Sequence, residues 1–210
     1  MTPAPGRPRD PAIDAAVLKA AVDELAEGGY GGFALERVAA RAGTTKAAIR
    51  RRWPVRQRLV IDALGSVVAV PPAPDNGCTR CDLQQSVRLL AQTLDERLPA
   101  GVLAPLVADC AGDPELHRYL TDTLIAPSRA AAVVAVRRAV GRGDLIPEAD
   151  PELLVDLLAS VVYQRALFGQ EAVAARPLVD LLLRGVAVDF EELVRISRLP
   201  ASRRRAHVHD

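Results

Sequence analysis

Aromatic residues are scarce in this chain of 210 residues. They make up 3% of the sequence, although hydrophobic residues make up 50%. The core must therefore be built from Ala, Leu and Val. Because strand-rich proteins depend on β-branched and aromatic residues, this composition favours helices. The length allows one sizeable core, or a small domain followed by a larger one.

Cysteines are also few, and their odd number does not fit a secreted disulfide framework. Cys78 and Cys81 have CxxC spacing, but a tetrahedral zinc site needs two more ligands, and only Cys110 and His117 are available at a distance. We therefore expect no metal, and inert cysteines in a loop. A metal-binding or thiol-switch role is the alternative.

Long apolar runs, targeting signals and catalytic motifs are all missing. No stretch approaches the roughly 20 apolar residues that span a bilayer, and the first residues carry prolines and charges. The sequence therefore predicts a cytoplasmic protein. It contains no glycine-rich phosphate loop, nucleophile elbow or zinc-protease motif, so we expect neither an enzyme nor a cofactor. An enzyme body with a nucleic-acid-binding head is the rival interpretation.

Charge is distributed unevenly along the chain. Through residue 60 there are 11 Lys and Arg against 6 Asp and Glu, a net +5, which leaves −4 for residues 61–210 of a chain whose total is +1. A basic N-terminal module on a mildly acidic body is typical of a nucleic-acid reader with a separate second role. Chance variation among solvated surfaces is the alternative.

Residues 31–54 have the pattern of a helix-turn-helix. We expect helices over residues 11–28, 35–42 and 46–52, with Thr45 capping the third and Pro54 ending it. Their core should consist of Ile13, Val17, Leu25, Val38, Ala42, Ile49 and Trp53. Such a motif places its second helix, here the one predicted over residues 46–52, in the DNA major groove. This helix ends in three arginines. The sequence therefore predicts DNA binding.

The rest of the chain reads as further helices, so the predicted class is all-α. A fourth helix should cover about residues 55–70, and residues 71–81 form a turn-rich break. Further helices are expected over residues 82–98, 102–110, 114–126, 127–142, 151–168 and 177–196. The predicted organisation is a flexible basic arm over residues 1–11, a DNA-binding domain over 12–70, an effector-binding and dimerisation domain over 82–196, and a disordered tail over 197–210.

The last two predicted helices are apolar on more than one face. This pattern suggests a second packing surface that a two-fold axis doubles into a four-helix bundle. The expected interface residues are Leu154, Leu158, Val161, Leu178, Leu182 and Val186. Two buried core helices in a monomer are the alternative.

A few polar and aromatic residues interrupt the aliphatic helices of the body. Ligand pockets combine apolar walls with a few polar anchors. The candidates are His117, Tyr119, Tyr163, Gln164, Arg165 and Phe168. For any single one, a satisfied core or interface side chain is the alternative.

The stretch over about residues 6–66 resembles the DNA-binding domain of the TetR family of bacterial transcriptional regulators. The match is carried by Gly28-Gly29-Tyr30, by the segment VAARAG over residues 38–43 and by residues 46–59. Residues 141–170 are similar to one common C-terminal subgroup of that family. The resemblance implies a homodimer whose C-terminal domain binds a small molecule and thereby releases the DNA operator.

Motif and resemblance together predict the DNA contacts. These are Arg7 and Arg9 on the arm, Thr44, Thr45, Lys46, Ala47, Arg50, Arg51 and Arg52 on the second helix, and Arg56 after it. For Arg52 a solvated or core-capping role is the alternative. Relatives commonly have Tyr in place of Arg50, and Thr or Ser in place of Ala34, so the operator is expected to differ. A helix-turn-helix protein that acts through protein or ligand contacts without specific reading is the second candidate function.

Overall fold

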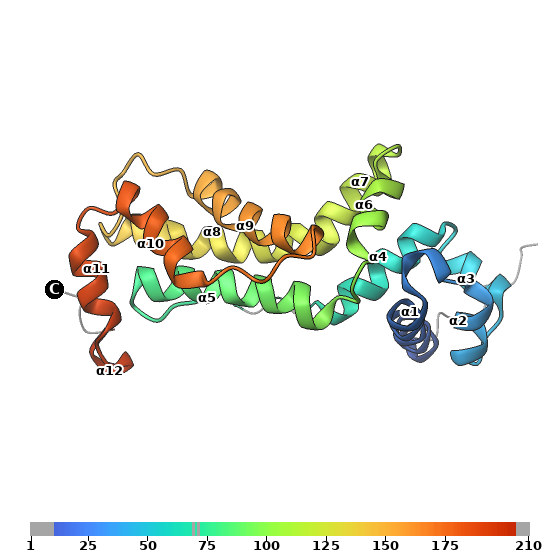
Figure 1. Ribbon diagram of the computed structural model, residues 1–210. Coiled ribbons are helices and arrows are strands. Elements are labelled where there is room, and N and C mark those ends of the chain that lie inside the picture. Colours follow the sequence, from blue (N-terminus) through green and yellow to red (C-terminus); the bar gives the residue numbers. More distant parts are fainter. Residues whose placement is uncertain (1–10, 69, 71, 205–210) are drawn as a thin grey trace, which may run out of the picture. The chain divides into compact units, whose positions relative to one another are not determined.

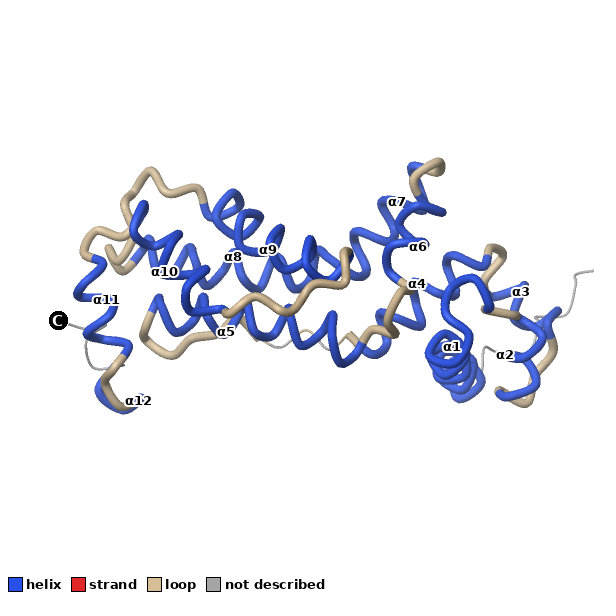
Figure 2. Tube along the Cα trace, viewed as in Figure 1, coloured by secondary structure: helices blue, strands red, loops and turns tan. Residues whose placement is uncertain are grey.

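The computed structural model describes residues 11–68, 70 and 72–204, and within them every regular element is a helix (Figures 1 and 2). A single isolated antiparallel bridge in this part of the chain joins Leu145 to Ala187. The predicted all-α class is confirmed. Arg7 and Arg9 lie outside the described residues. Within the described ranges, no helix combines the length and apolar character needed to cross a membrane.

The chain divides into two compact units. The first comprises Met1–Val67 with Pro99–Leu120, and the second Val68–Leu98 with Thr121–Asp210. The sequence placed the boundary after residue 70 and assigned residues 82–196 to one domain. Residues 99–120 instead pack with the N-terminal helices, because the Tyr30 hydroxyl and the Gln57 amide both donate to the carboxylate of Asp109, at 2.5 and 2.9 Å.

The first unit builds a small core around short helices. They are α1 (Pro11–Gly32), α2 (Leu35–Arg41), α3 (Lys46–Arg52), α4 (Arg56–Val67), α6 (Leu103–Cys110) and α7 (Pro114–Leu120). Helical geometry breaks within α1 at Gly29, where φ is 61°, next to the predicted end. The predicted core residues Val17, Leu25, Val38, Ile49 and Trp53 are buried, whereas Ile13 and Ala42 are only partly covered.

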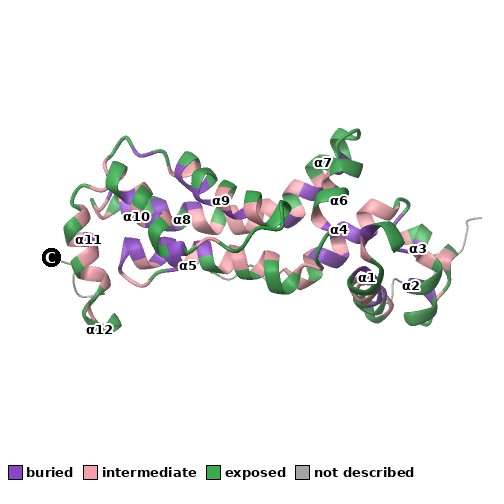
Figure 3. Cartoon of the chain, in the orientation of Figure 1, coloured by how far each residue is buried: buried purple, intermediate pink, exposed green. Residues whose placement is uncertain are grey.

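The second unit is a bundle whose apolar core comes mainly from four of its helices. Its elements are α5 (Thr79–Gln92), the π-helical turns η1 (Thr93–Arg97) and η2 (Thr121–Ile125), α8 (Ala126–Gly141), α9 (Pro151–Leu167), α10 (Ala175–Val186), α11 (Phe190–Ser197) and α12 (Ala201–Arg204). Leu83 of α5, Val136 of α8, Leu158 of α9 and Val179 of α10 belong to one cluster. Buried residues on these helices are purple in Figure 3. This apolar cluster supplies the packing that the scarce aromatics do not.

The C-terminal region differs from the sequence prediction in two places. One helix was expected over residues 177–196, but the chain turns after Val186, whose carbonyl accepts from Ile146 at 2.9 Å, and Asp189 then caps α11. A disordered tail was expected from residue 197, but Ala201–Arg204 form α12. The Arg204 guanidinium holds this turn by donating to the Leu199 carbonyl at 2.6 Å. Residues 205–210 lie outside the described part.

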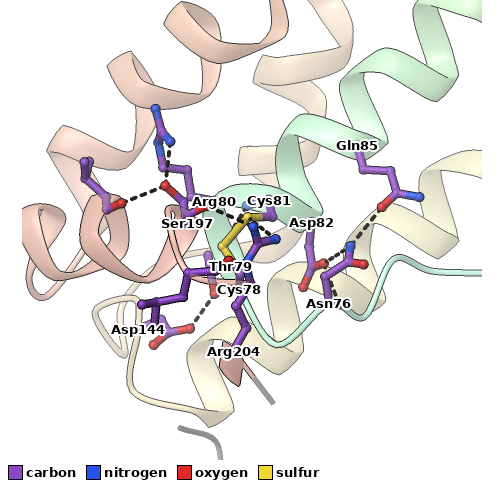
Figure 4. Close-up of a disulfide and its surroundings, with 12 residues drawn as sticks. Asn76, Cys78, Thr79, Arg80, Cys81, Asp82, Gln85, Asp144, Ser197 and Arg204 are labelled. Atoms are coloured by element: carbon purple, nitrogen blue, oxygen red, sulfur yellow. Dashed lines mark hydrogen bonds between the residues drawn. A yellow bond between two sulfur atoms is a disulfide. The ribbon is translucent and has the colours of Figure 1, made fainter. Parts of the chain in front are cut away.

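Helix α5 begins three residues earlier than expected, inside the predicted turn-rich break. Cys78 occupies its N-cap position, where its sulfur accepts a hydrogen bond from the Cys81 backbone at 3.2 Å. Cys78 and Cys81 are also joined by a disulfide (Figure 4). The expectation that these cysteines lie in a loop is therefore wrong, because both belong to the start of a helix.

Candidate DNA interface

The turn between α2 and α3 is built by short local interactions. Gly43 takes a left-handed conformation with φ of 61°, which glycine adopts without steric cost, and the Thr44 amide donates to the Ala39 carbonyl at 3.0 Å. The Thr45 hydroxyl oxygen then accepts from the Ala48 amide at 3.1 Å, which confirms the predicted cap. Ala34, before α2, makes no side-chain cap, as expected.

Helix α3 is anchored on one face only. Ile49 and Trp53 are buried, and the Trp53 indole donates to Asp62 of α4 at 2.7 Å. Helical periodicity then turns Ala47, Arg50 and Arg51 to the outside, where all three are exposed. A helix held this way presents small and cationic side chains on the opposite side.

Arg50 and Arg51 are the cations of α3 that the described part of the chain leaves without a charged partner. Lys46 differs, because its ammonium pairs with Glu36 of α2 and holds the pKa of that exposed carboxyl below its ordinary value. Exposed pairs of this kind are weak, so a phosphate can compete with Glu36 for Lys46. Two unpaired guanidiniums and one exchangeable ammonium therefore line this face.

Arg52 and Arg56 face the protein interior. The Arg52 side chain is 16% exposed and pairs with Asp14 of α1. The Arg56 guanidinium lies 4.3 Å from the centre of the Tyr30 ring and donates to the Tyr30 carbonyl. Both side chains therefore make contacts within the first unit. This favours the core-capping alternative for Arg52. It also gives Arg56 a structural partner, Tyr30, that the sequence did not reveal.

A buried carboxylate that the sequence analysis missed orients α2. Glu24 of α1 is 1% exposed and accepts from Arg37 Nε at 2.5 Å, while Arg41 Nε lies 3.8 Å from its second oxygen. Arg41 also pairs with Glu27. The sequence did contain a signal for these ion pairs. Glu24 and Glu27 are about one turn apart on the first helix, and Arg37 and Arg41 are about one turn apart on the second. These pairs fix α2, and through the turn they fix α3.

The predicted effector residues are divided between the two units. His117 and Tyr119 lie on α7, where the Arg58 guanidinium stacks 4.7 Å from the Tyr119 ring and the Tyr119 hydroxyl donates to Asp62. Tyr163, Gln164 and Arg165 lie on the last turns of α9 in the second unit, and Phe168 is its C-cap residue. Burial raises the pKa of Tyr163, whereas Phe168 is 74% exposed.

A small hollow in the second unit includes one of these candidates. Its lining residues are Ala91, Leu94, Asp95, Val162, Arg165, Ala166, Gln170, Ala172 and Val173. Arg165 donates to the Glu171 carbonyl at 2.9 Å on its rim. Asp95 and Gln170 were not anticipated, because they come from a π-helical turn and a loop whose approach to α9 has no local sequence signal.

The predicted interface residues mostly face the core of their own unit. Leu154 and Leu158 are 5% and 4% exposed, and Leu178, Leu182 and Val186 pack against the same cluster. The exposed apolar side chains are their neighbours, Leu153 and Leu157 on α9 and Leu181 on α10, at 55%, 47% and 73%. Val161 is partly exposed on the α9 stripe. The apolar surface therefore lies about one residue away from the predicted positions.

Comparison with known proteins agrees with this arrangement. Residues 17–63 match the family model "Bacterial regulatory proteins, tetR family", and residues 73–184 match "Tetracyclin repressor-like, C-terminal domain". The DNA-binding transcriptional repressor TetR of Mycobacteroides abscessus is 30% identical over 177 residues, covering 80% of this chain and 91% of that protein. An uncharacterised HTH-type transcriptional regulator of Bacillus subtilis, YdeS, is 27% identical over 85% of this chain and 90% of its own length.

A solved structure gives the same result. The TetR family transcription regulator SCO0332 superposes with a TM-score of 0.65 and 31% identity, over 83% of this chain and 98% of that one. Matches to both halves of the chain, an exposed cationic α3 and a helical second unit point to one family. The chain belongs to the TetR family of DNA-binding transcriptional regulators.

Proposed function

We propose that this protein is a homodimeric repressor that releases its operator when a small molecule binds the second unit. The exposure of Arg50 and Arg51 on α3, without charged partners among the described residues, is the observation that carries the DNA-reading half of this proposal. Small Ala47 on the same face allows close approach to the groove, and arginine pairs bidentately with guanine. Thr44 and Thr45 precede α3 at its N-terminal end, near Ala47.

Arg50 also gives the proposed contact its particular chemistry. Family relatives commonly carry tyrosine at this position, which stacks over a phosphate. A guanidinium replaces that stacking with a charge-assisted contact that depends more strongly on salt. The operator is therefore expected to differ from those of relatives with the aromatic residue.

The dimer follows from the exposed apolar side chains of α9 and α10. Leu153 and Leu157 are one helical turn apart, and Leu181 lies on the neighbouring helix. Side chains of this size rarely stay in water on adjacent helices without a partner surface. A two-fold copy of the same helices would bury them in a four-helix bundle, and a dimer provides the two copies of α3 that two half-sites require.

The effector is assigned to the hollow beside α9. Its walls are apolar at Leu94 and Val162, while Arg165, Asp95 and Gln170 supply polar groups of different charge. The hollow has a volume of only about 10 Å³, enough for one water molecule, so a small amphipathic molecule with an acidic group directed at Arg165 would enter only after the wall moves. The wall formed by η1 and the loop after α9 consists of short elements, which can adjust around a ligand more easily than long helices.

The main proposal is tested by measuring whether the protein binds one DNA sequence specifically. The full-length protein is titrated by fluorescence anisotropy against the DNA upstream of its own gene and against random duplex of equal length, at physiological salt. We expect upstream DNA to bind at least about a thousandfold more tightly than random DNA. Equal affinities for the two duplexes would refute specific reading and favour action through protein or ligand contacts.

A further inference from the structure

The Cys78–Cys81 pair lies at the start of α5, which several side-chain hydrogen bonds hold in place. Thr79 donates to Asp144 at 2.5 Å, and the backbone amide of Asn76 donates to Asp82 at 2.8 Å. Arg80 binds Asp180 through two nitrogens, at 2.6 and 2.8 Å. The first turn of α5 is therefore held by side chains that surround the disulfide and do not depend on it.

The disulfide itself is poorly suited to be a structural staple. It links residues three apart in sequence. A disulfide stabilises a fold chiefly by closing a loop in the unfolded chain, and this stabilisation is smallest for the shortest loops. A bond that adds little stability at a turn already held by other contacts can open without unfolding the helix.

The two sulfurs have different environments. Cys78 is 2% exposed, and its sulfur accepts the Cys81 backbone N–H at the helix N-terminus. Cys81 is partly exposed, and the Arg204 guanidinium donates to its sulfur at 3.3 Å. A helix N-terminus and a guanidinium both stabilise thiolate anions, so each sulfur has its own stabilising group.

We propose that Cys78 and Cys81 form a thiol–disulfide exchange site that reacts with low-molecular-mass thiols and their disulfides, and that Cys81 is the sulfur that meets them. In the oxidising direction the Cys81 thiolate attacks one sulfur of the external disulfide, forming a mixed disulfide and releasing one external thiolate. Cys78 then loses its proton and attacks the Cys81 sulfur. This step forms the internal bond and releases the second external thiolate.

The exchange balances in atoms and electrons. Two protein thiols and one external disulfide become one protein disulfide and two external thiols, with two electrons passing to the external sulfurs and two protons following them. Reduction runs through the same mixed disulfide in reverse. The burial of Cys78 does not prevent its step, because its attack is intramolecular.

The asymmetry between the sulfurs gives a sharp test with the full-length protein and glutathione disulfide. The matched variants are Cys78→Ser and Cys81→Ser, with glutathione adducts counted by intact-mass spectrometry and mapped by peptide digestion. We expect Cys78→Ser to gain one adduct on Cys81, and Cys81→Ser to react at least about tenfold more slowly, because its remaining CxxC sulfur is buried. Equal rates in the two variants would overturn the assignment of Cys81.

The unsubstituted protein tests the exchange without a variant. Reduced protein treated with glutathione disulfide is expected to lose two thiols together and to keep no stable adduct, while buried Cys110 remains a free thiol. Dithiothreitol should restore both thiols with the far-ultraviolet circular dichroism spectrum unchanged. Three free thiols after prolonged treatment, or loss of helix on reduction, would overturn the proposal.

Arg204 is tested separately in the Cys78→Ser background. Removing its guanidinium with Arg204→Gln should slow alkylation of Cys81 by iodoacetamide at neutral pH several-fold, because the thiolate is the reacting species. Arg198→Gln, an exposed arginine nearby in sequence, is the matched control and should leave the rate unchanged. An unchanged rate in Arg204→Gln would overturn the role of this guanidinium.

Discussion

Replacing Arg50 and Arg51 together should weaken DNA binding and reduce its dependence on salt, without unfolding the protein. Neither side chain has a charged partner among the described residues, and both are exposed. The double variant Arg50→Ala/Arg51→Ala therefore removes no internal contact that holds α3. Ile49, Trp53 and the Thr45 cap remain in place.

The expected magnitude follows from counting charges. A dimer carries two copies of α3, so the double variant removes four cations from the proposed interface. Each phosphate contact contributes about −0.9 to the slope of log affinity against log salt on B-DNA, so the slope should become less steep by up to about 3.6. Where one of these arginines contacts a base instead, its loss relaxes specificity at that base pair by about 1–3 kcal/mol.

The assay is anisotropy titration of labelled operator at four potassium chloride concentrations between 50 and 200 mM, for the double variant and the unsubstituted protein. Arg88→Ala/Arg198→Ala is the matched control, since it removes the same charge from exposed positions of the second unit. The control should keep the original slope. A slope unchanged in Arg50→Ala/Arg51→Ala, with thermal unfolding also unchanged, would show that α3 does not face the DNA as proposed.

Three further outcomes follow from the structure. Arg37→Ala removes the nearer of the two cations beside the buried Glu24 carboxylate, leaving Arg41 Nε at 3.8 Å, and should lower the midpoint of urea denaturation; an unchanged midpoint would contradict it. The Arg80 guanidinium holds the pKa of Asp180 below its ordinary value. This ion pair therefore stabilises the folded protein above about pH 4, and the stabilisation is lost as the pH falls through the pKa that Asp180 has in the folded protein. Unfolding midpoints between pH 6 and 3 should therefore fall less steeply in Asp180→Asn than in the unsubstituted protein, and parallel profiles would argue against the pair. Leu157→Asp should convert the proposed dimer to a folded monomer in sedimentation velocity, and a persistent dimer would place the interface elsewhere.

Local patterns were sufficient for the helix-turn-helix. The bounds of α3, the Thr45 cap, the missing cap at Ala34 and the break at Gly29 all depend on a few neighbouring residues, so they can be predicted from the sequence. The same holds for the all-α class, which composition and 3.6-residue periodicity indicate.

Contacts between distant segments were beyond the reach of these patterns. The sequence predicted five cations from Lys46 to Arg56 as DNA contacts and left a core-capping role open for Arg52. In the structure Arg52 pairs with Asp14, whereas Arg50 forms no salt bridge within the described residues. Periodicity marked the apolar helices α9 and α10 but missed by about one position which leucines face outward, because one residue corresponds to only about 100° of rotation around a helix that is apolar on more than one face.

The sequence by itself therefore determined the helical class, the DNA-reading motif and the family, because each depends on short-range spacing and residue type. Only the tertiary structure decided which arginines remain exposed, which leucines are left for a partner, and that α6 and α7 pack with the N-terminal helices. It also brought Arg204 to Cys81 across 123 residues of sequence. The physical reason is the same in each case. Burial and ion pairing bring together residues that are far apart in the chain, and local sequence patterns do not predict such long-range contacts.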